Sequence, residues 1–505
     1  MNYDLNNKLT KNQRFLNIAY AKYDGKNDRW SLIKMANTEK VKASKVEKYG
    51  PVAPQLAIKN DLIMSESSVK NQSEQCHNLN IFRGRKNNNS QQGHLPVMVW
   101  IHGGGFTTGA SSLPIYDGSY LAEATNTLVI TLNYRLGSFG FLRLVDVTNN
   151  EITSTGNEGL EDQITALKWI QENIHLYGGD KDNITLFGES AGAMSIACLL
   201  SMPNTKGLFH KAILQSGAGH SYQTIAQANN VAKAYLNTAE SLGYNASQLA
   251  TLSTSEIMNI QKFFLGRPDI YKAFGILPFK PVIGTQGLPL APFEAIAQGC
   301  AIDIPIISGT NTDEWTLFAA MLNQNIQDEQ ALQKALRPLI GEQHVAQCLT
   351  LMSEQCKQRE LDSSPQNILN EVFTEFWFNQ PNQRLLEAQL KAGGEAYNYK
   401  LGRRSVIPAL RCSHIIDIGL VFNHLSKGLY GEDKRVNELV DELQTCWGTF
   451  AYNGSPSSSS IYWPKVSKLT SEFVFFDHHA TCLQPIDQDK QVFWSLISHQ
   501  KLASF

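Results

Sequence analysis

Short apolar stretches alternate with longer amphipathic segments through most of the 505-residue chain. Most of the short stretches are continuously apolar, which is typical of strands buried on both faces of a largely parallel sheet. The pattern predicts seven such strands, at residues 97–101, 127–132, 184–187, 211–214, 305–308, 396–401 and 473–476.

An amphipathic segment, residues 160–178, connects the second and third predicted strands. Its apolar residues recur at helical spacing, at Leu160, Ile164, Leu167, Ile170 and Ile174. Strand, crossover helix and strand form a βαβ unit, so the predicted class is α/β with a mostly parallel sheet. Residues 223–304 are longer than one crossover needs and helix-rich in composition. We therefore expect one domain over residues 1–505, with 223–304 as a helical insertion or cap.

Composition narrows the possible partners. Forty-four Lys and Arg residues nearly balance 46 Asp and Glu residues, for a net charge of −2. With no basic excess to neutralise phosphates, nucleic acid is not an expected partner.

The polar segments 83–93 and 455–460 are predicted surface loops. No stretch approaches the roughly 20 apolar residues that span a bilayer, and no signal peptide is evident at the N-terminus. We therefore expect a cytoplasmic protein, with secretion as the alternative if a signal peptide has been removed.

The eight cysteines are too sparse for a disulfide scaffold, and none forms a C-x-x-C pair. Cys348 and Cys356 have no nearby histidines at zinc-ligand spacing. We therefore expect neither a metal nor another cofactor.

The strongest chemical signal is Gly188-Glu189-Ser190-Ala191-Gly192, directly after the predicted strand 184–187 and before an apolar segment of helical length. This is the setting of a nucleophile elbow, in which a tight strand-to-helix turn exposes a serine hydroxyl. The small residues at both ends have a steric reason, since larger side chains would collide with the neighbouring strand and helix. A merely structural turn is the alternative interpretation.

A second signal is His102-Gly103-Gly104-Gly105-Phe106, at the end of the predicted strand 97–101. Consecutive glycines allow backbone N–H groups to form a concave nest that can hold a developing oxyanion. A phosphate-binding loop is disfavoured, because no Gly-Lys-Ser/Thr sequence follows and no helix begins at the glycines.

These motifs and several others, in the same order, resemble the type B carboxylesterases of the α/β-hydrolase fold, a family that includes the cholinesterases. The resemblance covers residues 15–476, through FLNIAYA (15–21), SEQCHNLNIF (73–82), VMVWIHGGGF (97–106), NYRLGSFGFL (133–142), GNEGLEDQITALKWI (156–170), FGESAGA (187–193), QSGA (215–218), TNTDEW (310–315) and WGTFAYNGSP (447–456). It implies an α/β-hydrolase fold and hydrolysis of small-molecule carboxylic esters through an acyl-enzyme. Amide or carbamate cleavage, or acyl transfer to an alcohol, would use the same residues. A catalytically silent binding protein is a third alternative, because this fold also serves adhesion.

The resemblance also implies roles for individual residues. Ser190 matches the nucleophile, and the amides of Gly104, Gly105 and Ala191 match the oxyanion hole. The catalytic acid matches Glu314, with its neighbour Asp313 as the chief rival.

The base is expected to follow the acid in the chain. The histidines there are His344, His414, His424, His478, His479 and His499. His414 follows the predicted strand 396–401 by a short loop and precedes the apolar sequence IIDIGLVF. The family histidine precedes a similar segment, which favours His414.

Two departures from the family bear on compartment and substrate. The family often pairs the cysteine equivalent to Cys76 with an upstream cysteine, where this chain has Ala53, and the missing disulfide favours a reducing compartment. Cholinesterases carry a tryptophan between these positions, but residues 54–75 contain none, so no cation–π cage is expected. The substrate pocket is expected to be uncharged, with walls that include Phe106, Tyr222 and Phe318.

Overall fold

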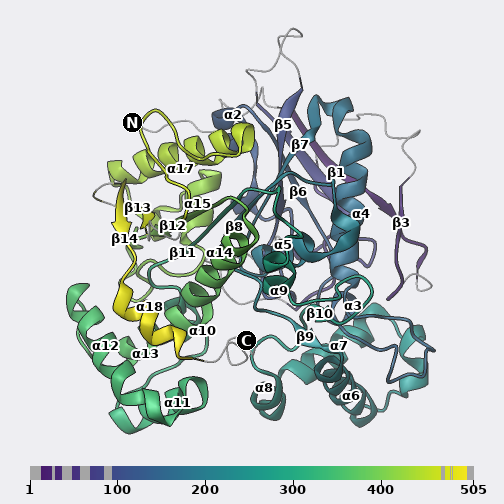
Figure 1. The fold of residues 1–505 in the computed structure, drawn as a ribbon. Coiled ribbons are helices and arrows are strands. Elements are labelled where there is room, and N and C mark those ends of the chain that lie inside the picture. The colour runs from purple at the N-terminus through teal and green to yellow at the C-terminus, as the bar shows by residue number, and fades with distance from the viewer. Residues whose placement is uncertain are drawn as a thin grey trace.

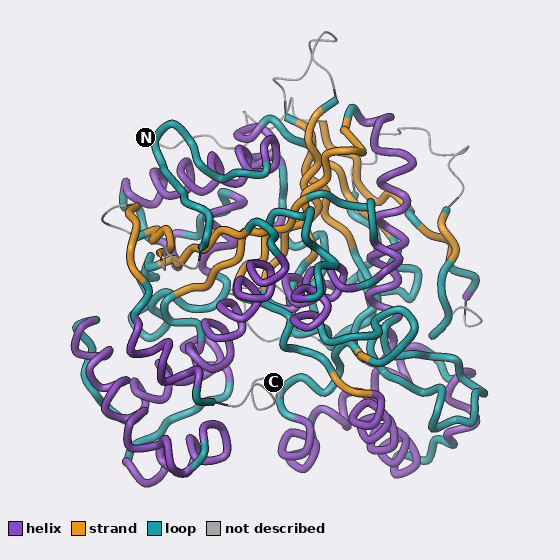
Figure 2. The backbone as a smooth tube through the Cα atoms, viewed as in Figure 1, coloured by secondary structure: helices purple, strands orange, loops and turns teal. Residues whose placement is uncertain are grey.

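The computed structural model describes residues 13–25, 29–36, 48–56, 69–84, 94–467, 472–477, 479 and 481–497. One large sheet crosses this part of the chain (Figures 1 and 2). Its ten strands lie in the order β1 (Gln13–Ala19), β4 (Asn78–Arg83), β6 (Leu128–Leu132), β5 (Leu95–Ile101), β7 (Gly179–Glu189), β8 (Lys211–Gln215), β11 (Ile306–Asn311), β12 (Ala396–Leu401), β13 (Glu472–Phe476) and β14 (Thr481–Pro485). The seven strands from β6 to β13 are parallel, and the pairs β1–β4, β4–β6 and β13–β14 are antiparallel.

Alternate residues of the central strand β5 enter two different cores. Val97, Val99 and Ile101 belong to the buried cluster that includes residues of α4 (Glu158–Asn173) and α5 (Ala191–Ser201). Met98 and Trp100 belong to the cluster that includes residues of α15 (Ile416–Phe422) and α17 (Lys434–Asn453). Burial on both faces explains why the strand is continuously apolar.

The chain after β11 forms a third buried cluster, in which α10, α11, α12 and α13 meet α18. These helices gather at one end of the sheet, and the helices of residues 223–304 lie beside them (Figure 1). The remaining helices are α2 (Ser119–Thr125), α3 (Gly137–Gly140), α6 (Ile225–Ser241), α7 (Thr254–Leu265), α8 (Pro268–Phe274), α9 (Pro292–Ala297), α10 (Trp315–Met321), α11 (Glu329–Ile340), α12 (Val345–Gln358), α13 (Pro365–Thr374), α14 (Gln380–Ala392), α16 (Lys427–Tyr430) and α18 (Gln488–Ser495). Two short strand pairs lie outside the large sheet: β2 (Ala21–Lys22) pairs with β3 (Lys34–Met35), and β9 (Gln223–Thr224) pairs with β10 (Val282–Ile283).

All seven predicted strands are present, and most are one to several residues longer than the apolar stretch that predicted them. The helix expected over 160–178 is α4, which ends at Asn173 and continues as a 3₁₀ turn, Ile174–Tyr177. Strands β1, β4 and β14 were not among the predicted strands; β1 and β14 lie at the sheet edges and are only partly buried, so their apolar signal is weak. Residues 455–460 form no helix or strand, whereas 85–93 of the other predicted loop lie outside the described residues. None of the described helices is long and apolar enough to cross a membrane.

Candidate active site

The carboxyl ends of the parallel strands bring the candidate residues to one edge of the sheet. Gly103 follows β5, Ser190 follows β7, and Glu314 lies three residues beyond β11. His414 comes from the loop after β12. In open α/β sheets, ligands bind outside the carboxyl ends of the strands, so this edge is the expected place for a site.

Ser190 occupies a strained turn between β7 and α5, with φ 53° and ψ −124°. Its amide donates to the Gln215 carbonyl at 2.9 Å, and its carbonyl accepts from the Met194 amide at 2.9 Å. A Cβ atom at Gly188 would lie 2.7 Å from the Ile101 carbonyl oxygen, and one at Gly192 would overlap the same oxygen. Glycine is therefore required on both sides of the serine, which is the steric reason inferred from the sequence.

The glycine run after β5 lies against this turn. A Cβ atom at Gly103 would approach Ser190 Cβ to 3.2 Å. Gly104 and Gly105 have φ values of 108° and 60°, a region that favours glycine. The Gly104 carbonyl accepts from the Thr108 amide at 3.0 Å, which fixes the turn.

His414 connects the two sides of the site. Its Nδ1 lies 2.6 Å from Glu314 Oε2, and its Nε2 lies 2.9 Å from Glu189 Oε1. Glu314 is fully buried, and its other oxygen accepts from the Asn311 amide at 2.7 Å. The ring centres of Phe318 and Phe378 each lie 5.0 Å from the centre of the imidazole.

The contact with Glu189 sets the electrostatics of the site. Burial alone would lower the pKa of His414, but the carboxylates of Glu189 and Glu314 outweigh it and raise that pKa above its ordinary value. Burial also raises the pKa of Glu189 to about 7, against the attraction of His414. The contact therefore favours the protonated imidazole, while burial disfavours the charged form of Glu189.

Asp313, the alternative candidate for the catalytic acid, contacts arginine side chains instead of His414. Its carboxylate binds Arg359 at 2.7 Å, lies 3.6 Å from Arg411 and accepts from Thr312 at 2.9 Å. Its amide donates to the Cys412 carbonyl at 3.0 Å. Asp313 thus joins the loop that carries Glu314 to the loop that carries His414.

We expect Asp313→Asn to destabilise the fold, because it removes the buried carboxylate that faces two guanidinium groups. Arg359 keeps Glu371 as a partner at 2.5 Å, so the expected cost is about 3 kcal/mol, at the lower end for breaking a buried ion pair. A urea titration followed by tryptophan fluorescence measures the shift of the unfolding midpoint. Asp146→Asn is the matched control, since its exposed pair with Arg143 should be worth less than about 1 kcal/mol. Equal midpoint shifts in the two variants would contradict the assignment of Asp313.

A cavity of about 310 Å³ opens onto these groups. Ser190, Ala191, His414 and the three glycines line it. Its other walls are mostly apolar. They include residues of the segment 223–304, of α10 and the residue after it, and of the turn before α14: Ile276, Leu277, Leu317, Phe318, Met321, Leu322 and Phe378.

Only one of the three expected wall residues lines this cavity. Phe318 does. Phe106 does not: with φ 59° its side chain turns into the core, where its ring lies 4.9 Å from that of Phe141. Tyr222 directly precedes β9, just before the segment 223–304, and is not a lining residue either. Leu317 and Met321 could have been inferred from their position on the helix after Glu314, whereas no sequence signal marks Ile276 and Leu277.

The other candidate histidines lie elsewhere. His344 packs against Phe493, and His424 lies beside Tyr120. Neither these nor His479 lines the cavity, and His478 and His499 lie outside the described residues. All eight cysteines, including the buried Cys76, are free thiols.

Comparison with known proteins identifies the family of the chain. The model of the carboxylesterase family matches residues 2–494. The chain is 36% identical over 457 residues to the para-nitrobenzyl esterase of Bacillus subtilis (strain 168), covering 88% of this chain and 87% of that protein. It is 28% identical over 463 residues to the pyrethroid hydrolase Ces2e of Rattus norvegicus, covering 88% and 78%.

Solved structures extend the agreement to the fold. A para-nitrobenzyl esterase superposes with a TM-score of 0.77 at 31% identity, over 98% of this chain and 96% of that one. A carboxylesterase from Geobacillus stearothermophilus gives a TM-score of 0.80 at 27% identity, over 96% of both chains. The described sheet and its flanking helices are those of an α/β-hydrolase. The chain belongs to the carboxylesterase family and is a carboxylic ester hydrolase.

Proposed function

We propose that Ser190, His414 and Glu314 form the catalytic triad and that the enzyme prefers neutral esters with apolar groups. The observation that carries the triad is the chain of contacts around His414, which is held by Glu314 on one nitrogen and presents the other toward the Glu189–Ser190 turn. The observation that carries the substrate class is the apolar wall of the cavity.

The reaction begins with attack of the Ser190 hydroxyl on the ester carbonyl. His414 Nε2 turns from Glu189 to the adjacent serine and accepts its proton, while Glu314 orients the imidazole and stabilises its cation. Catalytic hydrogen bonds often form fully only when substrate is bound, so the Glu189 contact represents the free enzyme. His414 then donates the proton to the departing alcohol. Water repeats the attack on the acyl-enzyme, releases the carboxylic acid and restores the serine.

The developing oxyanion is held by the amides of Gly104, Gly105 and Ala191. These residues line the cavity beside Ser190, at the point where the glycine run meets the start of α5. Loss of one such donor typically costs about 3 kcal/mol of transition-state stabilisation.

Neutral esters should be better substrates than choline esters that carry the same acyl group. The cavity's charged side chains, Glu189 and His414, already face one another, so a trimethylammonium head would lose hydration without gaining a partner. Apolar alcohol groups instead gain about 25 cal/mol per Å² of surface buried against the walls. We expect kcat/KM for a neutral butyrate ester to exceed that for butyrylcholine by tenfold or more, which corresponds to about 1.4 kcal/mol.

The comparison uses one enzyme preparation and one buffer, so the acyl group is constant and only the alcohol changes. An amide analogue of the neutral ester, measured beside it, reports whether the same triad also cleaves amides. A tenfold preference for butyrylcholine would contradict the proposed substrate class and would require a cation site that the described walls do not provide.

A further inference from the structure

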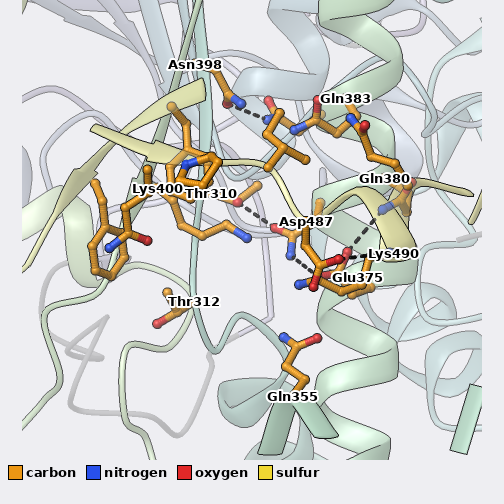
Figure 3. A pocket seen from close by; sticks show the side chains of 18 of the residues that line it. Thr310, Thr312, Gln355, Glu375, Gln380, Gln383, Asn398, Lys400, Asp487 and Lys490 are labelled. Atoms are coloured by element: carbon orange, nitrogen blue, oxygen red, sulfur yellow. Dashed lines mark hydrogen bonds and ion pairs between the residues drawn. The ribbon is translucent and has the colours of Figure 1, made fainter. Parts of the chain in front are cut away.

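A second cavity, of about 280 Å³, lies among the last four strands of the sheet and the helices α12, α14 and α18 (Figure 3). It shares no lining residue with the cavity at Ser190. Its walls combine aromatic and aliphatic groups with side-chain amides from α12, α14, α18 and the sheet. The amides can donate and accept hydrogen bonds from several sides, which suits a small hydrophilic ligand.

On one wall of this cavity, the polar side chains form hydrogen bonds and an ion pair with one another. Glu375, which is 3% exposed, accepts from Asn379 at 3.0 Å and from Gln380 at 3.1 Å, and its carboxylate binds Lys490 at 3.3 Å. Asn379 in turn accepts from the Thr310 hydroxyl at 2.6 Å. Burial opposes ionisation of Glu375, but Lys490 and Lys400 lower its pKa to about 2, so the carboxylate stays charged and neutralises Lys490.

Lys400 is a further lysine on the cavity wall, and it forms no ion pair among the described residues. It extends from β12 on the cavity wall, with its ammonium 5.7 Å from the centre of the Phe473 ring (Figure 3). Among the described residues, no carboxylate lies within ion-pair distance of its Nζ and no group accepts a hydrogen bond from it. Burial lowers the pKa of Lys400 to about 8. The third cation on the wall, Arg359, is paired with Asp313 and Glu371.

The side-chain oxygen of Gln355 is a hydrogen-bond acceptor without a donor among the described residues. Gln355 lines the cavity, and Figure 3 shows its amide end directed toward it. Its Nε2 donates to Glu371 at 2.7 Å, whereas its Oε1 is buried and has no partner among the described residues. A buried acceptor without a donor is unfavourable, and a ligand hydroxyl would supply the missing donor.

We propose that this cavity binds a small hydroxycarboxylate, with Lys400 holding the carboxylate and the Gln355 side-chain oxygen accepting from a hydroxyl. Lys400 forms no ion pair among the described residues, so its ammonium can pair with a ligand that carries one negative charge. A phosphate dianion would place a second negative charge near the buried carboxylate of Glu375, which disfavours it. The proposal does not depend on the triad, because it uses no residue of the catalytic cavity.

The test is a calorimetric titration of the full chain with lactate and with the longer gluconate. We expect saturable binding of at least one of them, weaker binding of propionate, which lacks the hydroxyl, and none of lactamide, which lacks the charge. Lys400→Met should weaken binding by about tenfold or more, since it removes a charge-assisted hydrogen bond. Lys391→Met, at an exposed position on α14 outside the cavity, is the matched control and should bind like the wild type.

Two further measurements locate the ligand and guard against a folding defect. Blocking Ser190 with a phosphonate should leave hydroxycarboxylate binding unchanged, and Lys400→Met should retain wild-type hydrolysis of nitrophenyl esters. The melting temperature of the wild type should rise with lactate or gluconate and stay constant with lactamide. This measurement uses only the wild type, so it tests binding even if Lys400→Met does not fold. The proposal is overturned if neither hydroxycarboxylate binds, if Lys400→Met binds equally well, if phosphate or propionate binds more tightly, or if blocking Ser190 abolishes binding.

Discussion

Ser190→Ala should lower kcat for nitrophenyl ester hydrolysis by about four to six orders of magnitude, as expected when the nucleophile of a triad is removed. The fold should survive, because the substitution deletes one hydroxyl and keeps a small side chain in the turn. The backbone strain at φ 53° is the same for alanine as for serine. Stopped assays at high enzyme concentration measure the residual rate, and the melting temperature reports the fold.

Ser216→Ala is the matched control for this variant. Ser216 directly follows the neighbouring strand β8, and its φ of 51° is positive like that of Ser190. It is fully buried but does not line the catalytic cavity. Its alanine variant should keep kcat within a few-fold of the wild type. If Ser190→Ala retained wild-type turnover, or if both variants lost it equally, Ser190 would not be the nucleophile.

His414→Gln should lower kcat/KM for the same esters by at least about a thousandfold, since the general base and its later role as acid are both lost. The wild type should lose activity with one proton as pH falls, because a protonated Nε2 cannot accept the serine proton. Glu189 and Glu314 raise the pKa of His414, so this loss should be centred above the 6.5 of an ordinary histidine. In the variant, the residual rate should no longer follow this titration.

His424→Gln separates this role from a general effect of removing a histidine. His424 lies on the loop after α15, beside Tyr120 and outside the cavity, so its variant should keep both the rate and the pH profile. A pH series of kcat/KM for the three proteins makes the comparison. An inactive His424→Gln beside an active His414→Gln would show that the base had been misplaced.

The parts of the site that could be predicted from sequence are those where backbone geometry demands a particular residue. Gly188 and Gly192 are visible because any side chain there would meet the Ile101 carbonyl, and Gly104 is visible because its φ is 108°. The central strands were predictable for a similar reason: burial on both faces leaves a continuous apolar run, as in β5.

The parts that escaped prediction depend on how distant segments meet. The contact between Glu189 and His414 joins residues 225 positions apart, and nothing in the motif around Ser190 reveals it. Phe106 was named as a wall residue only because it is uncharged, whereas its ring packs in the core against Phe141. In the sequence, Lys400 is an ordinary strand residue. Only the structure shows that Arg359 and Lys490, the other cations on that cavity wall, have ion-pair partners.

The central claim is that one serine, Ser190, forms the covalent intermediate. The most direct measurement is labelling of the folded enzyme with a fluorophosphonate, followed by mass mapping of the digested chain. We expect one adduct per molecule, on the peptide that contains Gly188-Glu189-Ser190-Ala191-Gly192, and none in Ser190→Ala. An adduct on another serine, or a folded and active enzyme that takes up no label, would contradict the account.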